Sequence, residues 1–94
     1  MASRTVFFIS DQTGVTAETL GHSLMTQFVG ESFRQVTVPF VDSESRAVEL
    51  KDRIDRAAAQ DQHRPIVFSS LVHDELRAIL REANGFYLDI FDAF

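Results

Sequence analysis

Hydrophobic and polar positions along this chain alternate between a strand-like pattern and a helix-like pattern. β-prone apolar runs at 5–9, 33–41, 65–68 and 86–88 predict four strands, and the first is apolar throughout, as in a strand covered on both faces. Pro39 interrupts the second run, so that strand is expected to lie at a sheet edge or to end there.

Between these runs, apolar residues recur at helical spacing and predict three helices. The expected buried stripes are Val15, Leu20, Leu24, Met25, Phe28 and Val29; then Ala47, Leu50, Ile54, Ala57 and Ala58; then Val72, Leu76, Ile79, Leu80 and Ala83. The expected stop signals are Gly30 for the first helix and Asn84-Gly85 for the third. Expected caps are Asp42 or Ser43 for the second helix and Ser69 or Ser70 for the third. The pairs Glu49/Arg53 and Asp52/Arg56 are expected on the wet face of the second helix.

Strict alternation of strand and helix patterns predicts a single α/β domain over residues 1–94. We expect an open three-layer parallel sheet of flavodoxin-like or Rossmann-like type. Right-handed crossovers most simply give the strand order 2-1-3-4, with the first helix on one face and the other two on the opposite face. The chain direction then reverses between the first and third strands, and ligands bind at such a switch point.

Small polar residues follow the first and third strands, where the switch point would lie. They are Ser10, Asp11, Thr13, Gly14, Thr16, Ser69 and Ser70, with Asp42 as a further candidate. The turn after the first strand opens a helix, whose amides and dipole favour a phosphate or another anion. Asp11 is the catalytic candidate, able to bind a metal, orient a substrate hydroxyl or accept a proton. Plain helix capping is the alternative interpretation of these residues, and the same dipole argument covers Glu18.

Composition narrows the possible functions. The net charge is −5, with fourteen acids interleaved among eight arginines and one lysine, which argues against a general nucleic-acid binder. The chain has no cysteine, and its three histidines lack metal-site spacing, so no metal site is expected. His22 is expected at the surface or in an interface. The longest apolar runs are too short to span a membrane and there is no signal-peptide pattern, so the expected location is the cytoplasm.

The residues at 89–94 are the second informative stretch. Ile90, Phe91 and Phe94 are apolar at helical spacing, yet the sequence given ends there. A fourth strand without a covering helix would expose an apolar face. Such faces indicate an interface or the boundary of a fragment. The expectation is an amino-terminal fragment of a longer protein, or a face buried in a homodimer.

Several motifs resemble one known family along nearly the whole chain. They are RTVFFISDxTGxTAETLGH at 4–22, VPFVDSESRA at 38–47, RPIVFS at 64–69 and GFxxDIF at 85–91. In content and order they resemble the amino-terminal region of the phosphoenolpyruvate synthase regulatory proteins, which belong with the pyruvate, phosphate dikinase regulatory proteins. The 38–47 motif looks more like the synthase subgroup. Gln12 departs from the pattern, because the family more often has a small residue there.

This resemblance implies a bifunctional parent protein. Members of the family phosphorylate a threonine of the target enzyme with ADP as donor, and remove that phosphate in a phosphate-dependent reaction that releases pyrophosphate. Their nucleotide loop, of the G-x-x-x-x-G-K-[ST] type, lies later in the polypeptide. Lys51, the single lysine here, has no glycine near it, so this piece alone is not expected to transfer phosphate. ADP and phosphate are therefore expected as ligands of the longer parent.

Two further classes stay open at this stage. A flavodoxin-like FMN carrier is one, because the 10–16 turn superficially resembles a flavin phosphate loop, although the chain has no Trp and only Tyr87 as tyrosine to flank the ring. A ligand-free docking or dimerisation module, or a receiver-like domain, is the other. A receiver would need an acidic residue where this chain has Ser69 and Ser70.

Overall fold

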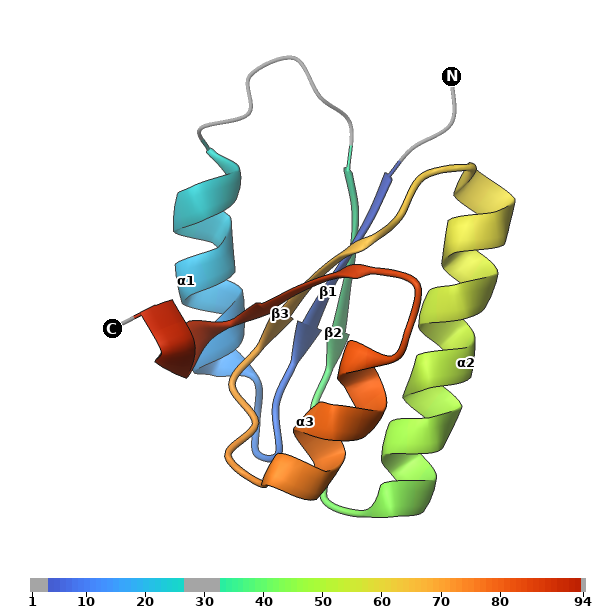
Figure 1. Cartoon of the computed structure of the whole chain (residues 1–94). Coiled ribbons are helices and arrows are strands. Elements are labelled where there is room, and N and C mark those ends of the chain that lie inside the picture. The colour runs from blue at the N-terminus through green and yellow to red at the C-terminus, as the bar shows by residue number, and fades with distance from the viewer. Residues whose placement is uncertain (1–3, 27–32, 94) are drawn as a thin grey trace.

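A parallel four-stranded sheet in the order β2-β1-β3-β4 forms the middle layer of the computed structural model (Figure 1). The structure describes residues 4–26 and 33–93. Its elements are β1 (Arg4–Ile9), α1 (Val15–Met25), β2 (Phe33–Val38), α2 (Glu44–Asp61), β3 (Ile66–Ser69), α3 (Asp74–Arg81), β4 (Phe86–Asp89) and a short 3₁₀ helix, η1 (Ile90–Ala93). The predicted fold class and strand order are therefore confirmed, and β2 lies at an edge and ends before Pro39.

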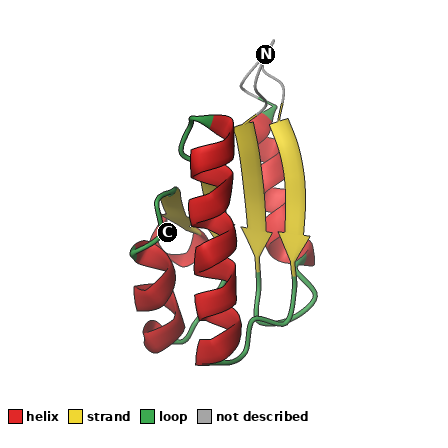
Figure 2. Cartoon of the chain, turned by 90° about the vertical axis from the view of Figure 1, so that its right-hand side faces the viewer, coloured by secondary structure: helices red, strands yellow, loops and turns green. Residues whose placement is uncertain are grey.

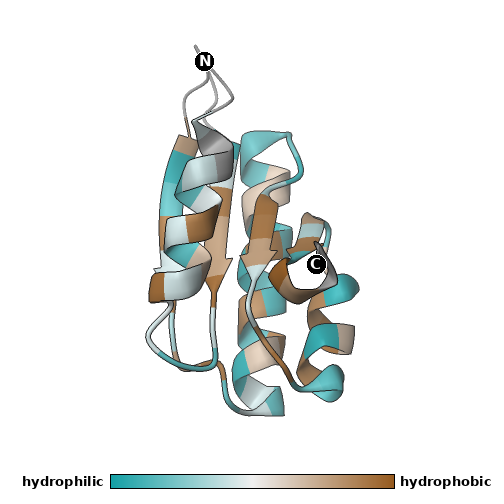
Figure 3. Cartoon of the chain, turned by 90° about the vertical axis from the view of Figure 1, so that its left-hand side faces the viewer, coloured by the Kyte–Doolittle hydropathy of each residue, from teal (hydrophilic) through white to brown (hydrophobic). Residues whose placement is uncertain are grey.

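The helices lie on the predicted faces, with α1 on one side of the sheet and α2 and α3 on the other (Figures 1 and 2). Alternate residues of β1 supply both cores, because successive side chains of a strand point to opposite faces. Phe7 and Ile9 pack with the buried stripes of α2 and α3, whereas Val6 and Phe8 pack with Ala17 of α1. Figure 3 shows hydrophobic stretches along the strands and on the turn near the end of the chain.

Helix α1 approaches the sheet through small residues rather than through the whole predicted stripe. Ala17 and Gly21, one turn apart, are both buried, whereas Val15 is 66% exposed. Val15 is the first residue of α1 and lines the loop end of the sheet, so its assignment to the core was wrong. The predicted helix end at Phe28, Val29 and Gly30 lies outside the described residues.

Helix α2 matches its predicted buried stripe, and Ser43 is its cap. The Ser43 hydroxyl accepts a hydrogen bond from the Arg46 amide, as predicted for one of the two cap candidates. Among the described residues, neither expected ion pair of the wet face, Glu49 with Arg53 or Asp52 with Arg56, is formed. Arg56 donates to the main-chain oxygen of Asp52, and Lys51 pairs with Asp55 at 3.1 Å.

Helix α3 begins later than expected. Its N-cap is His73, without a side-chain cap bond, and neither Ser69 nor Ser70 caps it, because a loop separates β3 from the helix. Val72 lies in that loop and is 57% exposed, so it was wrongly placed in the helical stripe. Leu76 and Leu80 do form the buried side of α3.

The last strand has the exposed apolar face that the sequence predicts. Phe86, Leu88 and Phe91 are each between 43% and 50% exposed. The guanidinium of Arg64 lies 4.0 Å from the centre of the Phe86 ring and covers part of it. Phe94 lies outside the described residues.

Close packing at Gly21 gives a stability prediction. A Cβ at this position would overlap the Phe8 ring, and Phe8 is fully buried. We expect Gly21→Ala to lower the free energy of unfolding by about 1–2 kcal/mol, because overpacking outweighs the gain in helix propensity. Urea unfolding checks this, with the exposed α1 substitution Ser23→Ala as control. An unchanged or raised stability of Gly21→Ala would contradict the packing described for α1.

Asp55 links α2 to the turn before β4 and gives a pH prediction. Its carboxylate accepts from the Asn84 amide at 2.8 Å, and this bond, with Lys51, holds the pKa of Asp55 below its ordinary value of 3.8. The stabilisation is complete above that ordinary value and is lost as the pH falls through the lower folded pKa. We expect Asp55→Asn to lower the free energy of unfolding by about 0.5 kcal/mol at pH 7. The difference between the two proteins should shrink as the pH falls below 3.8 and through the lower folded pKa, and a difference that stays constant with pH would contradict this account.

Candidate functional site

The loop between β1 and α1 is held in a fixed shape by its own polar groups. The Ser10 hydroxyl accepts a hydrogen bond from the Gln12 amide at 3.0 Å, which closes a tight turn. Gly14 has φ +86°, a conformation that favours glycine. The first bond of α1 runs from the Glu18 amide to the Gly14 carbonyl, so the amides of residues 15–17 have no acceptor within the helix.

The loop after β2 is fastened to this first loop by main-chain hydrogen bonds. Phe40 donates its amide to the Gln12 carbonyl at 2.8 Å, and Val41 donates to the Ser10 carbonyl at 2.9 Å. Phe40 has φ +60°, an uncommon value for a residue with a side chain. The amide of Ser10 is bonded in turn to the Val38 carbonyl. The two loops therefore form one unit.

The two serines after β3 have different positions. Ser70 lies against the end of β1, where its amide and hydroxyl both donate to the Ile9 carbonyl, at 3.0 and 3.3 Å. Ser69 is fully buried, and its hydroxyl accepts from the Tyr87 hydroxyl at 2.9 Å and from the Leu71 amide. Burial raises the pKa of Tyr87, so this phenol stays protonated and keeps donating at neutral pH.

A cavity of about 220 Å³ lies at these loop ends and brings most of the candidate residues together. Its lining residues are Ser10, Asp11, Gln12, Thr13, Gly14, Val15, Thr16, Ser70, Val72 and Phe91. Ser69 and Asp42 are not among them, which corrects their placement in the crevice. Strand alternation turns Ser69 toward Tyr87, and Asp42 lies 3.6 Å from Arg46 on α2.

Three apolar residues of the lining, Val15, Val72 and Phe91, were not recognised as site residues from the sequence. Val15 and Val72 were assigned to buried helical stripes, and Phe91 to the apolar stretch at 89–94. The spacing of apolar residues alone cannot distinguish a core residue from one that lines a cavity at the carboxyl end of a sheet. Their common signal is position, since each lies within a few residues of a strand or helix terminus. Phe91 places an aromatic ring at this cavity, whereas Tyr87 bonds Ser69 instead.

The chemistry of the cavity is that of hydroxyls, helix amides and one carboxylate. Among its lining residues there is no lysine, arginine or histidine, so positive potential there comes from the amino terminus of α1. Glu18 does not reach the cavity, because its carboxylate accepts from the Thr37 hydroxyl at 2.6 Å. His22 stacks on Phe8, with ring centres 5.4 Å apart. The arrangement suits a small anionic or hydroxyl-bearing group.

The described part of the chain lacks a metal-ligand cluster and a membrane-spanning helix. Within residues 4–26 and 33–93, no three His, Cys, Asp or Glu side chains come together as metal ligands would. No helix in those same ranges has the length and apolar character needed to cross a membrane.

The fold and this crevice define the class of molecule. It is an α/β domain with a polar pocket at the carboxyl ends of its central parallel strands, the usual ligand position in such sheets. The sequence pattern of the kinase/pyrophosphorylase family matches residues 6–94, and the chain belongs to that family.

Three proteins similar to this chain share the same name. The chain is 54% identical over 91 residues to a protein from Aromatoleum aromaticum and 50% identical over 91 residues to one from Stutzerimonas stutzeri. It is 47% identical over 92 residues to one from Thiocapsa roseopersicina. Each is named "Putative phosphoenolpyruvate synthase regulatory protein". The matches cover 97–98% of this chain but 33–34% of the relatives, so the chain spans about a third of their length.

Gly14 gives a direct test of the loop geometry. An added Cβ would strain the backbone at φ +86° and meet Thr37 Cγ2 at 3.1 Å. We expect Gly14→Ala to lower the free energy of unfolding by about 1–2 kcal/mol in urea unfolding. Gln12→Ala, which removes only an exposed side chain from the same loop, should change it by less than about 0.5 kcal/mol. Equal effects of the two substitutions would contradict the strained turn.

Proposed function

We propose that this chain is the amino-terminal domain of a bifunctional kinase and pyrophosphorylase that regulates phosphoenolpyruvate synthase. In this proposal the whole protein inactivates its target by ADP-dependent phosphorylation of a threonine. It restores activity by a reaction in which inorganic phosphate attacks the phosphothreonine, threonine leaves with a proton, and pyrophosphate is released. The observation that carries the proposal is the family match over residues 6–94, supported by relatives with a regulatory name.

The nucleotide loop of this protein is proposed to lie outside the chain. Lys51 is the single lysine, and it lies in the middle of α2 in an ion pair with Asp55. The lysine of a G-x-x-x-x-G-K-[ST] nucleotide loop lies in a glycine-rich turn that opens a helix, whereas Lys51 lies inside a helix with no glycine near it. ADP is therefore assigned to the rest of the protein, and this domain alone is not expected to transfer phosphate.

The crevice is proposed to hold the small phosphate species of the reverse reaction. Thr13, Thr16 and Ser70 supply hydroxyls there, and α1 supplies amides at its amino terminus. Asp11, partly exposed at the rim, is the candidate to orient a hydroxyl or accept a proton. Family membership favours this role over the flavin carrier, and a ligand-free docking or dimerisation role is the outcome if no anion binds.

An amide NMR titration with phosphate, pyrophosphate, ADP and FMN in turn tests the proposed site. We expect saturable shifts with phosphate or pyrophosphate, confined to residues 10–16 and to Ser70, because these residues line the cavity. Thr16→Val, which removes a lining hydroxyl, should weaken binding about tenfold, equivalent to about 1.4 kcal/mol. Thr19→Val, an exposed α1 substitution outside the lining, is the matched control.

The outcomes separate the alternatives. Shifts with FMN at submillimolar concentration, with yellow protein, would replace the proposal with the flavin carrier. No shift with any of the four ligands would remove the anion site and leave a docking or dimerisation domain of the same family.

A further inference from the structure

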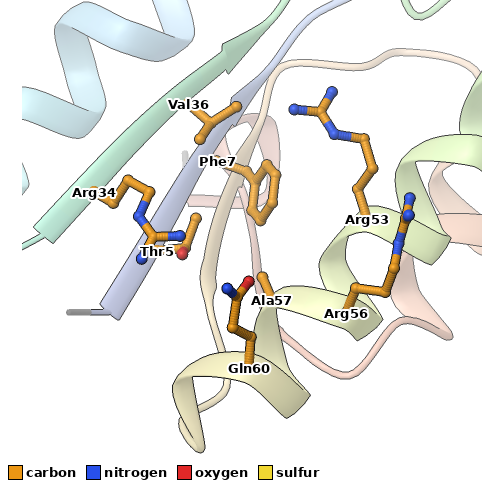
Figure 4. A pocket seen from close by; sticks show the side chains of 8 residues that line it. All are labelled: Thr5, Phe7, Arg34, Val36, Arg53, Arg56, Ala57 and Gln60. Carbon is orange, nitrogen blue, oxygen red and sulfur yellow. The ribbon is translucent and has the colours of Figure 1, made fainter. Parts of the chain in front are cut away.

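A second cavity, of about 370 Å³, lies on the other face of the sheet, between the edge strand β2 and helix α2 (Figure 4). It is lined by Thr5, Phe7, Arg34, Val36, Arg53, Arg56, Ala57 and Gln60. Three of these eight residues are arginines and none is an acid, although the chain as a whole has a net charge of −5. A local concentration of guanidinium groups in an acidic protein attracts an anionic partner.

The arginines surround an apolar floor. Arg53 and Arg56 rise from α2 on one side of Phe7, and Arg34 lies beside Thr5 on the other side (Figure 4). The Arg53 guanidinium is 6.0 Å from the centre of the Phe7 ring. Arg34 lies 3.6 Å from the buried carboxylate of Asp61, yet its side chain is 52% exposed and remains accessible to a ligand.

A neighbouring cavity extends this surface along β2. It has a volume of about 200 Å³, shares Arg53 with the 370 Å³ cavity, and adds Val38, Phe40 and Arg46. Together the two cavities form what we call the basic groove, lined by Arg34, Arg46, Arg53 and Arg56 beside β2. Glu49 is the single acid of this lining. The groove is longer than one phosphate group and suits an extended ligand.

From Arg34 to Val38, the strand beside the groove has no described strand on its outer side. β2 pairs with β1 on one side, and no described strand pairs with its other side. An edge strand presents unpaired main-chain donors and acceptors, and a peptide can add to it as a further strand. Alternate side chains of the added strand would then face the groove, as Arg34 and Val36 of β2 do.

We propose that the β2 edge and the basic groove bind an extended acidic segment of a protein partner. Main-chain hydrogen bonds to β2 hold the segment, and carboxylates at alternate positions contact the arginines. A second copy of this chain fits less well, because pairing of two β2 edges would bring two arginine-lined grooves together. The proposal is independent of the crevice, which lies at the loop ends on the α1 side of the sheet.

The test uses a capped eight-residue peptide of alternating Glu and Thr, followed by amide and arginine Nε NMR of this chain. We expect saturable shifts of the β2 amides and of Arg34, Arg53 and Arg56, weakened by added salt. Arg53→Glu with Arg56→Glu should weaken binding at least about tenfold. Arg64→Gln, which removes an exposed arginine outside the groove, is the control and should leave binding unchanged.

Three results would overturn this proposal. The first is equal binding of a peptide with Lys in place of Glu. The second is saturation of the arginine signals by inorganic phosphate with no shift of the β2 amides by the peptide, which would reduce the groove to a small-anion site. The third is concentration-dependent shifts of β2 without peptide, which would assign the edge to a second copy. None of these outcomes bears on phosphate binding in the crevice.

Discussion

Burial of β1 on both faces is the constraint on which the rest of this structure depends. Val6, Phe8 and Ile9 have no exposed surface, and Phe7 is 3% exposed, so each face of the strand needs a covering layer. The chain meets this need by placing α1 on one face and α2 with α3 on the other. The next strands must then lie on opposite sides of β1, and their diverging connections leave an open crevice at the carboxyl ends.

The sequence predicted the fold well because its signals were local and repeated. The stripe from Ala47 to Ala58 and the edge position marked by Pro39 are both present in the structure. The errors lie at the ends of elements. They concern Val15, Val72 and the serine caps of α3, because apolar residues keep helical spacing beyond the turns that pack on the sheet. Of the two serines after β3, Ser70 lines the crevice and Ser69 does not, because one residue of strand alternation reverses the side-chain direction.

Charge distribution was the feature least accessible to sequence reasoning. Net charge and interleaved signs describe α2 as a solvated helix, and its acids and bases do alternate along the chain. In three dimensions, Arg53 and Arg56 line the same cavity as Arg34 of β2, while Lys51 and Asp55 pair elsewhere on the helix. The strand order determines which side of α2 lies beside the edge strand β2, and this side of the helix carries the arginines that line the cavity.

The hydrogen bonds between the loops after β1 and β2 determine how the crevice can respond to a ligand. Ser10 and Gln12 are fastened to residues 38–41 by three main-chain bonds of 2.8–3.1 Å. A hinged lid would have to break such bonds each time it opened. The two loops at the crevice are therefore held in one conformation before any ligand binds. Binding of the proposed phosphate ligand to a loop that is already held in shape would cost little further conformational entropy. Selectivity of the proposed anion site would therefore come from the fit between the ligand and rigid groups of the protein.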